Sequence, residues 1–260
     1  MRRRTVRLPN HSDQGVGVVH GYDFSGRVVV ITGGANGIGA VTAREAAKAG
    51  ARVVVLDLDE NAGKAVADEH VNITFRTLDV ANHDEVLATV EQIMADHGRI
   101  DGLVCCAIVQ PIVPVLELTP ETLSAVFDVN VAGVVWMSKA VAPVMARQNS
   151  GSIVYFASGV VEIGKPNSTP YAASKGAVAG FARSFAKEIA PYGVRVNLCR
   201  PGIIDTPQYR AANPGADFST LDRPEDAVGP VMFLLSDDAT MTNSIVTREG
   251  TLPRTPKVFA

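Results

Sequence analysis

The chain has few cysteines, little net charge and no apolar segment of membrane-spanning length. Its 260 residues include three cysteines, an odd number that leaves a remainder in any disulfide framework. They lie among apolar residues, which favours a reducing, cytoplasmic compartment. No apolar run reaches the ~18 residues that a membrane span requires. A formal net charge of −3 gives no reason to expect nucleic acid or an anionic membrane as a partner.

The amino-terminal segment, residues 1–23, lacks the apolar stretch of an export signal. Four arginines near the start are followed by Pro, Asn, Ser and Gly, so the segment is not a secretory signal. We predict a flexible basic tail. A targeting role, or an arm that packs on another subunit, remains an alternative.

From residue 27 onward, short β-branched runs alternate with helical stretches. The expected strands are residues 28–31, 52–56, 73–78, 100–106, 152–156, 194–198 and a weak 244–247. The expected helices are residues 40–49, 60–69, 84–97, 120–147, 171–190 and 224–235. This alternation predicts an α/β fold with a doubly wound, Rossmann-type parallel sheet and helices on both faces. No linker or repeat interrupts it, so residues 24–260 are expected to form a single domain.

A glycine-rich turn separates the first expected strand from the first helix. Gly33, Gly37 and Gly39 are spaced G-x-x-x-G-x-G. Glycines in this position let the backbone approach a diphosphate at the helix amino terminus. The alternative is a tight connection without a ligand, but the strand before the turn and the helix after it favour phosphate binding.

Asp57 ends the second expected strand, where a carboxylate can accept hydrogen bonds from both ribose hydroxyls of an adenosine. The same charge would repel a 2′-phosphate. The glycine turn contains Asn36, and Leu58 directly follows Asp57, so neither position supplies a cation. The pattern therefore predicts NAD as the cofactor, against the alternative of a solvated aspartate. Asp79 ends the third strand and could bind the adenine amino group.

Tyr171 and Lys175 lie four residues apart in a helix-favouring run, so they share one helix face. A cation beside a phenol favours the phenolate and lowers its pKa from about 10. Such a phenol can exchange a proton with an alcohol or carbonyl oxygen. Taken alone, such a pair is by default an ordinary surface contact.

Several motifs together resemble the short-chain dehydrogenase/reductase family over about residues 24–251. They are Thr32-Gly33-x-x-x-Gly37-x-Gly39, Asp79, Asn130, Ser158, Tyr171-x-x-x-Lys175 and Pro201-Gly202, in the family's order and spacing. The resemblance implies that Tyr171 is the catalytic acid/base. It implies that Lys175 lowers the tyrosine pKa and also binds the nicotinamide ribose.

The same resemblance assigns further roles. Ser158 is similar to the serine that hydrogen-bonds the reacting oxygen, and Asn130 to the asparagine that breaks the long helix and holds a relay water. Their alternatives are a strand-end cap and an interior helical asparagine. The implied cofactor residues are Gly33, Asn36, Gly37, Ile38, Gly39, Asp57, Leu58, Asp79, Val80, Cys106, Ala107, Tyr171, Lys175, Pro201, Gly202, Ile204 and Thr206. No metal site is expected.

Two segments depart from the family pattern. Cys105-Cys106-Ala107-Ile108 stands where the family usually has Asn-Asn-Ala-Gly. Ile108 is expected to narrow the nicotinamide end or to reshape the substrate pocket. The two cysteines are expected to be buried apolar residues, with a reactive thiol as the alternative. Arg248-Glu249-Gly250-Thr251 matches the usual Asp-Gly-Gly only in part.

The predicted function is an NAD-dependent oxidoreductase that moves hydride between nicotinamide and a secondary alcohol or ketone. A nucleotide-sugar epimerase or dehydratase and a non-catalytic NAD-binding regulator remain the alternatives. The substrate is expected to be medium-sized and largely apolar or cyclic, with Arg210 and Lys165 as the nearest cations. The alternative is that Arg210 clamps a carboxylate. The expected pocket walls are Ile108, Gln110, Val160, Val161 and residues 207–222. Apolar residues around helices 120–147 and 171–190 predict a homodimer or homotetramer.

Overall fold

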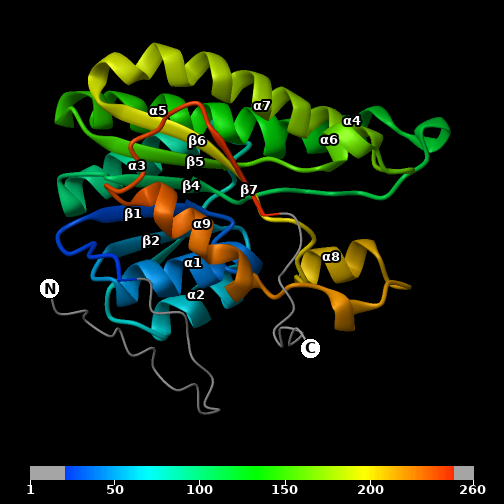
Figure 1. The fold of residues 1–260 in the computed structure, drawn as a ribbon, viewed down its shortest axis with the longest axis horizontal. Coiled ribbons are helices and arrows are strands. Elements are labelled where there is room, and N and C mark those ends of the chain that lie inside the picture. The colour runs from blue at the N-terminus through cyan, green and yellow to red at the C-terminus, as the bar shows by residue number, and fades with distance from the viewer. Residues whose placement is uncertain (1–20, 249–260) are drawn as a thin grey trace, which may run out of the picture.

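A seven-stranded sheet lies between two layers of helices in the computed structural model, which describes residues 21–248 (Figure 1). All neighbouring strands are parallel, in the order β3-β2-β1-β4-β5-β6-β7. The strands are β1 (Val28–Thr32), β2 (Arg52–Asp57), β3 (Ile73–Thr77), β4 (Gly102–Cys105), β5 (Gly151–Phe156), β6 (Val194–Arg200) and β7 (Ile245–Thr247). The predicted doubly wound sheet is confirmed. The expected basic tail and the Glu249-Gly250-Thr251 segment lie outside the described residues, apart from residues 21–23.

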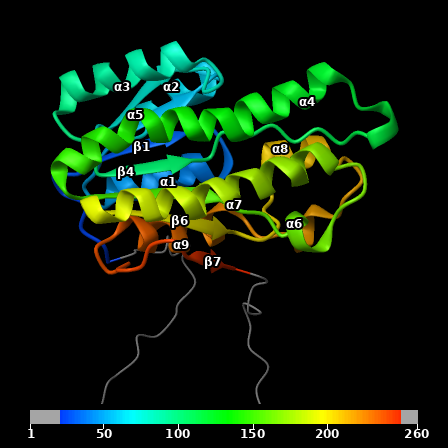
Figure 2. The ribbon, with the colours of Figure 1, turned by 90° about the horizontal axis from the view of Figure 1, so that it is seen from above.

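Helices cover both faces of the sheet (Figure 2). They are α1 (Gly37–Lys48), α2 (Glu60–Asp68), α3 (His83–His97), α4 (Pro120–Phe127), α5 (Gly133–Gln148), α6 (Val160–Ile163), α7 (Thr169–Ile189), α8 (Pro207–Ala212) and α9 (Pro224–Leu235). Within β1, Val28 and Val30 pack toward α3, α5 and α7, whereas Val29 and Ile31 pack toward α1 and α9. Because successive strand residues point to opposite faces, a strand buried on both sides must be apolar throughout. That requirement explains the continuous Val/Ile runs of the sequence.

The predicted helix 120–147 is interrupted. A π-helical turn, Asp128–Ala132, joins α4 to α5 and places Asn130 at its centre. Such turns are rare and occur frequently at functional sites. The expectation that Asn130 breaks the long helix is therefore confirmed.

The same stretch has the length and composition of a membrane helix. Of the helices in the described residues, only Pro120–Gln148 passes that test, and 50% of its most apolar window is buried inside the protein. Its α5 part packs against α3, α7 and β5. The apolar composition is thus accounted for by a core helix of the α/β layer.

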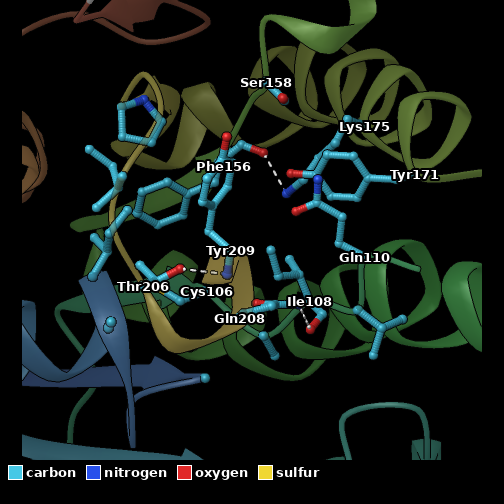
Figure 3. A pocket seen from close by; sticks show the side chains of 18 of the residues that line it. Cys106, Ile108, Gln110, Phe156, Ser158, Tyr171, Lys175, Thr206, Gln208 and Tyr209 are labelled. Atoms are coloured by element: carbon cyan, nitrogen blue, oxygen red, sulfur yellow. Dashed lines mark hydrogen bonds between the residues drawn. The ribbon is translucent and has the colours of Figure 1, made fainter. Parts of the chain in front are cut away.

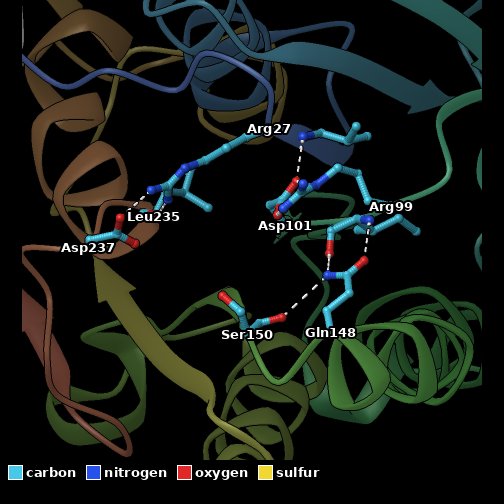
Figure 4. Close-up of polar contacts among 9 residues, drawn as sticks. Arg27, Arg99, Asp101, Gln148, Ser150, Leu235 and Asp237 are labelled. Carbon is cyan, nitrogen blue, oxygen red and sulfur yellow. Dashed lines mark hydrogen bonds and ion pairs between the residues drawn. The ribbon is translucent and has the colours of Figure 1, made fainter.

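Polar contacts tie the amino ends of the strands together (Figure 4). Asp101 accepts a hydrogen bond from the backbone N–H of Val28 at 2.8 Å and pairs with Arg99. The Gln148 side chain at the end of α5 donates to the carbonyl of Ile100 at 2.8 Å and accepts from its N–H at 3.1 Å. These contacts satisfy backbone groups at the amino ends of the strands, and the candidate site lies at the carboxyl ends.

The strand order reverses between β1 and β4. The chain winds from β1 through β2 to β3, and then returns to place β4 on the other side of β1. In open α/β sheets, ligands bind outside the carboxyl ends of the strands at such a reversal. The loops after β1 and β4 are therefore the structural starting point for the site.

Candidate active site

One cavity of about 890 Å³ opens at the carboxyl ends of the strands. Its volume lies within the range of about 300–1,000 Å³ that is common for small-molecule sites. Every predicted cofactor residue lines it, as do three of the four predicted catalytic residues: Ser158, Tyr171 and Lys175. The sequence motifs therefore converge on a single space.

The glycine turn forms one wall of this cavity. Gly33 has a φ of +65°, and a Cβ atom there would lie 2.4 Å from the backbone nitrogen of Ala107. A Cβ atom on Gly39 would lie 2.2 Å from the carbonyl oxygen of Gly33. Only glycine fits at these two positions, so the backbone of the turn is exposed beside the positive amino end of α1. This cradle suits a diphosphate, and the residues present fit a dinucleotide.

Asp57 stands at the end of β2 with its carboxylate held in place. One oxygen accepts from the N–H of Ala35 in the glycine turn, and the other accepts from the N–H of Asp59, each at 3.0 Å. Leu58 beside it is 62% exposed and brings no charge. The cationic residues that line the cavity are Lys165, Lys175 and Arg200, all on segments after β5. In the described lining, the segment directly after β2 therefore contains no cation that could bind a 2′-phosphate.

Tyr171 and Lys175 project from α7 toward the end of β5 (Figure 3). Both are buried, at 7% and 4% exposure. The ammonium of Lys175 donates to the backbone carbonyl of Phe156 at 3.0 Å and lies 5.7 Å from the centre of the Tyr171 ring. Ser158 lies two residues after the end of β5 and lines the same cavity. The predicted pair is therefore an interior pair and not a surface contact.

The pKa of Tyr171 departs from the sequence-based expectation. Burial raises it above its ordinary value, and the hydrogen bond with Ser158 lowers it by less. Burial also lowers the pKa of Lys175, to about 8. The prediction that Lys175 brings the phenol pKa below 10 is therefore wrong for the protein without ligands, because desolvation disfavours both charged forms.

Asn130 is the predicted catalytic residue that does not line the cavity. It is 1% exposed, and its side chain accepts from the N–H of Val109 at 2.8 Å and donates to the carbonyl of Val109 at 2.9 Å. It also donates to the hydroxyl of Ser174 at 3.0 Å, and that hydroxyl donates to the carbonyl of Tyr171. Asn130 thus joins the loop after β4 to the first turns of α7.

The departure at Cys105-Cys106-Ala107-Ile108 begins at the last residue of β4 and continues into the loop that Asn130 holds. Burial raises the pKa of Cys105 to about 12 and that of Cys106 well above its ordinary value. A thiol in that state supplies little thiolate, which favours the expected apolar role over a reactive one. Ile108 lines the cavity, and its carbonyl accepts from the side chain of Gln208 at 3.0 Å.

The substrate side of the cavity was predicted only in part. Ile108, Gln110 and Val160 line it as expected. Val161 does not: it is 46% exposed, because the short helix α6 turns adjacent residues to different faces. The expected loop 207–222 contains α8, which contributes Gln208 and Tyr209 to the lining.

A sequence signal for α8 was present. Thr206 caps the helix by accepting from the N–H of Tyr209 at 3.1 Å, and Pro207 follows it at the first helical position. Threonine before proline is typical of a helix start. Arg210 on this helix does not line the cavity and forms two hydrogen bonds with Asp205, at 2.6 and 2.7 Å. Lys165 lines the cavity instead.

Comparisons with known proteins agree with this arrangement. Residues 27–217 match the family model described as short chain dehydrogenase. The chain is 33% identical to a 3-oxoacyl-(acyl-carrier-protein) reductase of Thermotoga maritima, over 88% of this chain and 98% of that protein. It is 36% identical to the cis-4-hydroxycyclohexanecarboxylate dehydrogenase of Sinomonas cyclohexanicum, over 84% of this chain and 93% of the relative. A solved 3-ketoacyl-(acyl-carrier-protein) reductase of Brucella melitensis complexed with NADH superposes with a TM-score of 0.80 at 27% identity, covering 86% of this chain and 97% of that one.

Proposed function

The chain belongs to the short-chain dehydrogenase/reductase family, and on that basis we propose that it is an NAD(H)-dependent oxidoreductase for a secondary alcohol or the matching ketone. One observation carries the proposal: Tyr171, Ser158 and Lys175 share a cavity with the glycine cradle and Asp57. A hydride acceptor bound along the cradle would therefore lie in the same space as a proton-exchanging phenol.

The proposed mechanism divides the work among a few side chains. The nicotinamide cofactor supplies the hydride chemistry when bound. Tyr171 accepts the hydroxyl proton during oxidation and returns it during reduction. Ser158 hydrogen-bonds the reacting oxygen. Lys175 binds the nicotinamide ribose, and its charge stabilises the phenolate form of Tyr171. Asn130 acts as a positioning residue through Val109 and Ser174, and its role in a water relay stays a prediction.

The preference for NAD over NADP is proposed from Asp57. Replacing it with alanine is expected to weaken NADH binding. The difference in binding free energy between NADH and NADPH should shrink by about 1–3 kcal/mol, the contribution of a hydrogen bond to a charged group. Fluorescence titration with NADH and NADPH measures both affinities. Asp57→Asn is the matched variant, because it keeps an acceptor for the N–H of Ala35 but removes the charge. Tighter binding of NADPH than NADH by the unmodified protein would refute the assignment.

We propose a medium-sized substrate with a largely apolar or cyclic body. Apolar residues on the substrate side of the cavity support this: Ile108, Val160, Ile163 and Ile203. One relative is named for a cyclic hydroxy acid and another for an acyl-chain ketone. The test is NAD⁺ reduction measured across a panel of cyclic and linear secondary alcohols. A protein that binds NADH but oxidises none of them would favour the non-catalytic alternative.

We also propose a cytoplasmic homodimer or homotetramer built on α4, α5 and α7. Leu123 on α4 is 40% exposed, and Ala173 and Gly180 leave the surface of α7 open to close packing. Contact with a second copy would remove this apolar face of α4, α5 and α7 from water. Light scattering is expected to give a multiple of the 27.4 kDa chain mass. The chain mass itself at micromolar concentration would contradict the proposal.

A further inference from the structure

Lys165 is a lysine on the substrate side of the cavity, on the segment between α6 and α7. It is half-buried, and its ammonium donates to the side-chain oxygen of Asn213 at 2.7 Å. The same ammonium lies 5.7 Å from the centre of the Tyr209 ring. Both partners are neutral, so they orient the charge without neutralising it.

The other charged groups near this side of the cavity already have ionic partners. Glu162 lines the cavity and is ion-paired with Arg200. Arg210 is paired with Asp205. Of the three cations in the described lining, Arg200 is ion-paired and Lys175 is assigned to the cofactor, which leaves Lys165 as the one that could meet a substrate charge. An ammonium has three N–H donors, and Asn213 accepts only one of them.

Resting on the proposed function, we propose that Lys165 binds a carboxylate of the substrate. The substrate class is then a secondary alcohol that carries a carboxylate on an apolar body, or the corresponding oxo acid. Ile108 and Val160 would contact the body, while Tyr171 exchanges the proton of the hydroxyl group.

A carboxylate fits better than a phosphate. One lysine provides one positive charge, which matches a monoanionic carboxylate. Phosphate groups carry more charge and are commonly met by several donors or by the fork of an arginine. The arginine that lines the cavity, Arg200, is already paired with Glu162.

The kinetic test compares two alcohols of nearly equal shape, 4-hydroxycyclohexanecarboxylate and 4-hydroxycyclohexanecarboxamide. The unmodified protein is expected to show the lower KM for the acid. Lys165→Gln is expected to raise the ratio of the acid KM to the amide KM by about tenfold or more, the effect of losing a hydrogen bond to a charged group. Lys165→Arg keeps the charge and should keep the preference for the acid.

Asn213→Ala is the matched control, because it removes the contact that orients Lys165 but leaves the ammonium. It is expected to change the KM ratio less than Lys165→Gln does. If the two variants change both KM values alike, Lys165 is only a structural contact between α8 and the 164–168 segment, and the proposal is wrong. Turnover of phosphorylated alcohols in preference to the acid would also overturn it.

A binding test does not depend on turnover. Cyclohexanecarboxylate and cyclohexanecarboxamide lack the reacting hydroxyl, and calorimetry with NADH present measures their affinities. We expect tighter binding of the acid, lost in Lys165→Gln and kept in Lys165→Arg. Equal binding of acid and amide, or binding of neither at millimolar concentration, would overturn the carboxylate site. Lys165-dependent binding of the acid by a protein that turns over no alcohol would support the site and reject the proposed oxidoreductase function.

Discussion

Replacing Tyr171 with phenylalanine is expected to lower kcat by at least about 10²–10⁴-fold, the usual contribution of general acid–base catalysis. The ring is buried, so phenylalanine keeps its packing and removes only the hydroxyl. NADH affinity is expected to stay close to that of the unmodified protein, because its proposed contacts are the glycine turn, Asp57 and Lys175. Steady-state rates beside NADH titration measure the two effects separately.

Tyr192→Phe makes the same chemical change at an exposed tyrosine after α7 and serves as the control. It is expected to leave kcat unchanged. A Tyr171→Phe protein that retains near-normal turnover would exclude Tyr171 as the acid/base. A variant that loses NADH binding together with turnover would instead point to a structural role.

The acid–base role of Tyr171 gives the expected direction of the pH dependence, and its raised pKa places the change at high pH. Oxidation of an alcohol needs the phenolate as base, and reduction of a ketone needs the phenol as acid. If burial still governs the phenol in the working complex, oxidation should rise with pH up to at least the ordinary tyrosine value of about 10. Reduction should fall over the same range. An oxidation rate that reaches its plateau near neutral pH would show that cofactor binding reverses the shift.

The cofactor side of the site was predictable because its signals are local. Gly33 lies in the turn after β1 and Gly39 in the first turn of α1, and each is required by a backbone atom that a Cβ would strike. Asp57 ends the adjacent strand. Parallel strands bring such positions to one edge of the sheet, so short-range sequence patterns determine which residues meet.

The substrate side depends on contacts between distant parts of the chain. Gln208 reaches Ile108 across 100 residues, and Lys165 reaches Asn213 across 48. Neither contact leaves a periodic pattern in the sequence. The pKa directions were equally inaccessible, since the burial that governs Tyr171 is a property of the packed core rather than of its spacing from Lys175.

Lys175 is expected to destabilise the ligand-free protein, so Lys175→Met should stabilise it. The side chain is 4% exposed, and its described hydrogen bond goes to a single carbonyl, that of Phe156. Burial lowers its pKa from an ordinary 10.5 to about 8, a difference equivalent to about 3 kcal/mol against the folded state when the lysine is charged. Methionine has a similar length and carries no charge, so the free energy of unfolding at pH 7 should rise by up to that amount.

The pH dependence of this stability difference has a definite sign. Below pH 8 the lysine is charged in both the folded and the unfolded protein, and the full cost of burying the ammonium is present. Between pH 8 and 10.5 the folded protein releases the proton and the unfolded chain retains it, so the unmodified protein gains stability as pH rises. The advantage of Lys175→Met is therefore expected to be largest below pH 8 and to vanish toward pH 10.5. Denaturant unfolding at several pH values measures it.

The same variant should lose catalysis. Lys175 is assigned two tasks: it binds the nicotinamide ribose and its charge stabilises the phenolate of Tyr171. Lys175→Met is therefore expected to lower kcat and also to weaken NADH binding. In this it differs from Tyr171→Phe, which should affect kcat alone. Lys187→Met, an exposed lysine near the end of α7, is the control and should change stability by less than about 0.5 kcal/mol. A Lys175→Met protein that is less stable than the unmodified protein at pH 7, or that binds NADH equally well, would contradict the assignment of a buried cation kept for function.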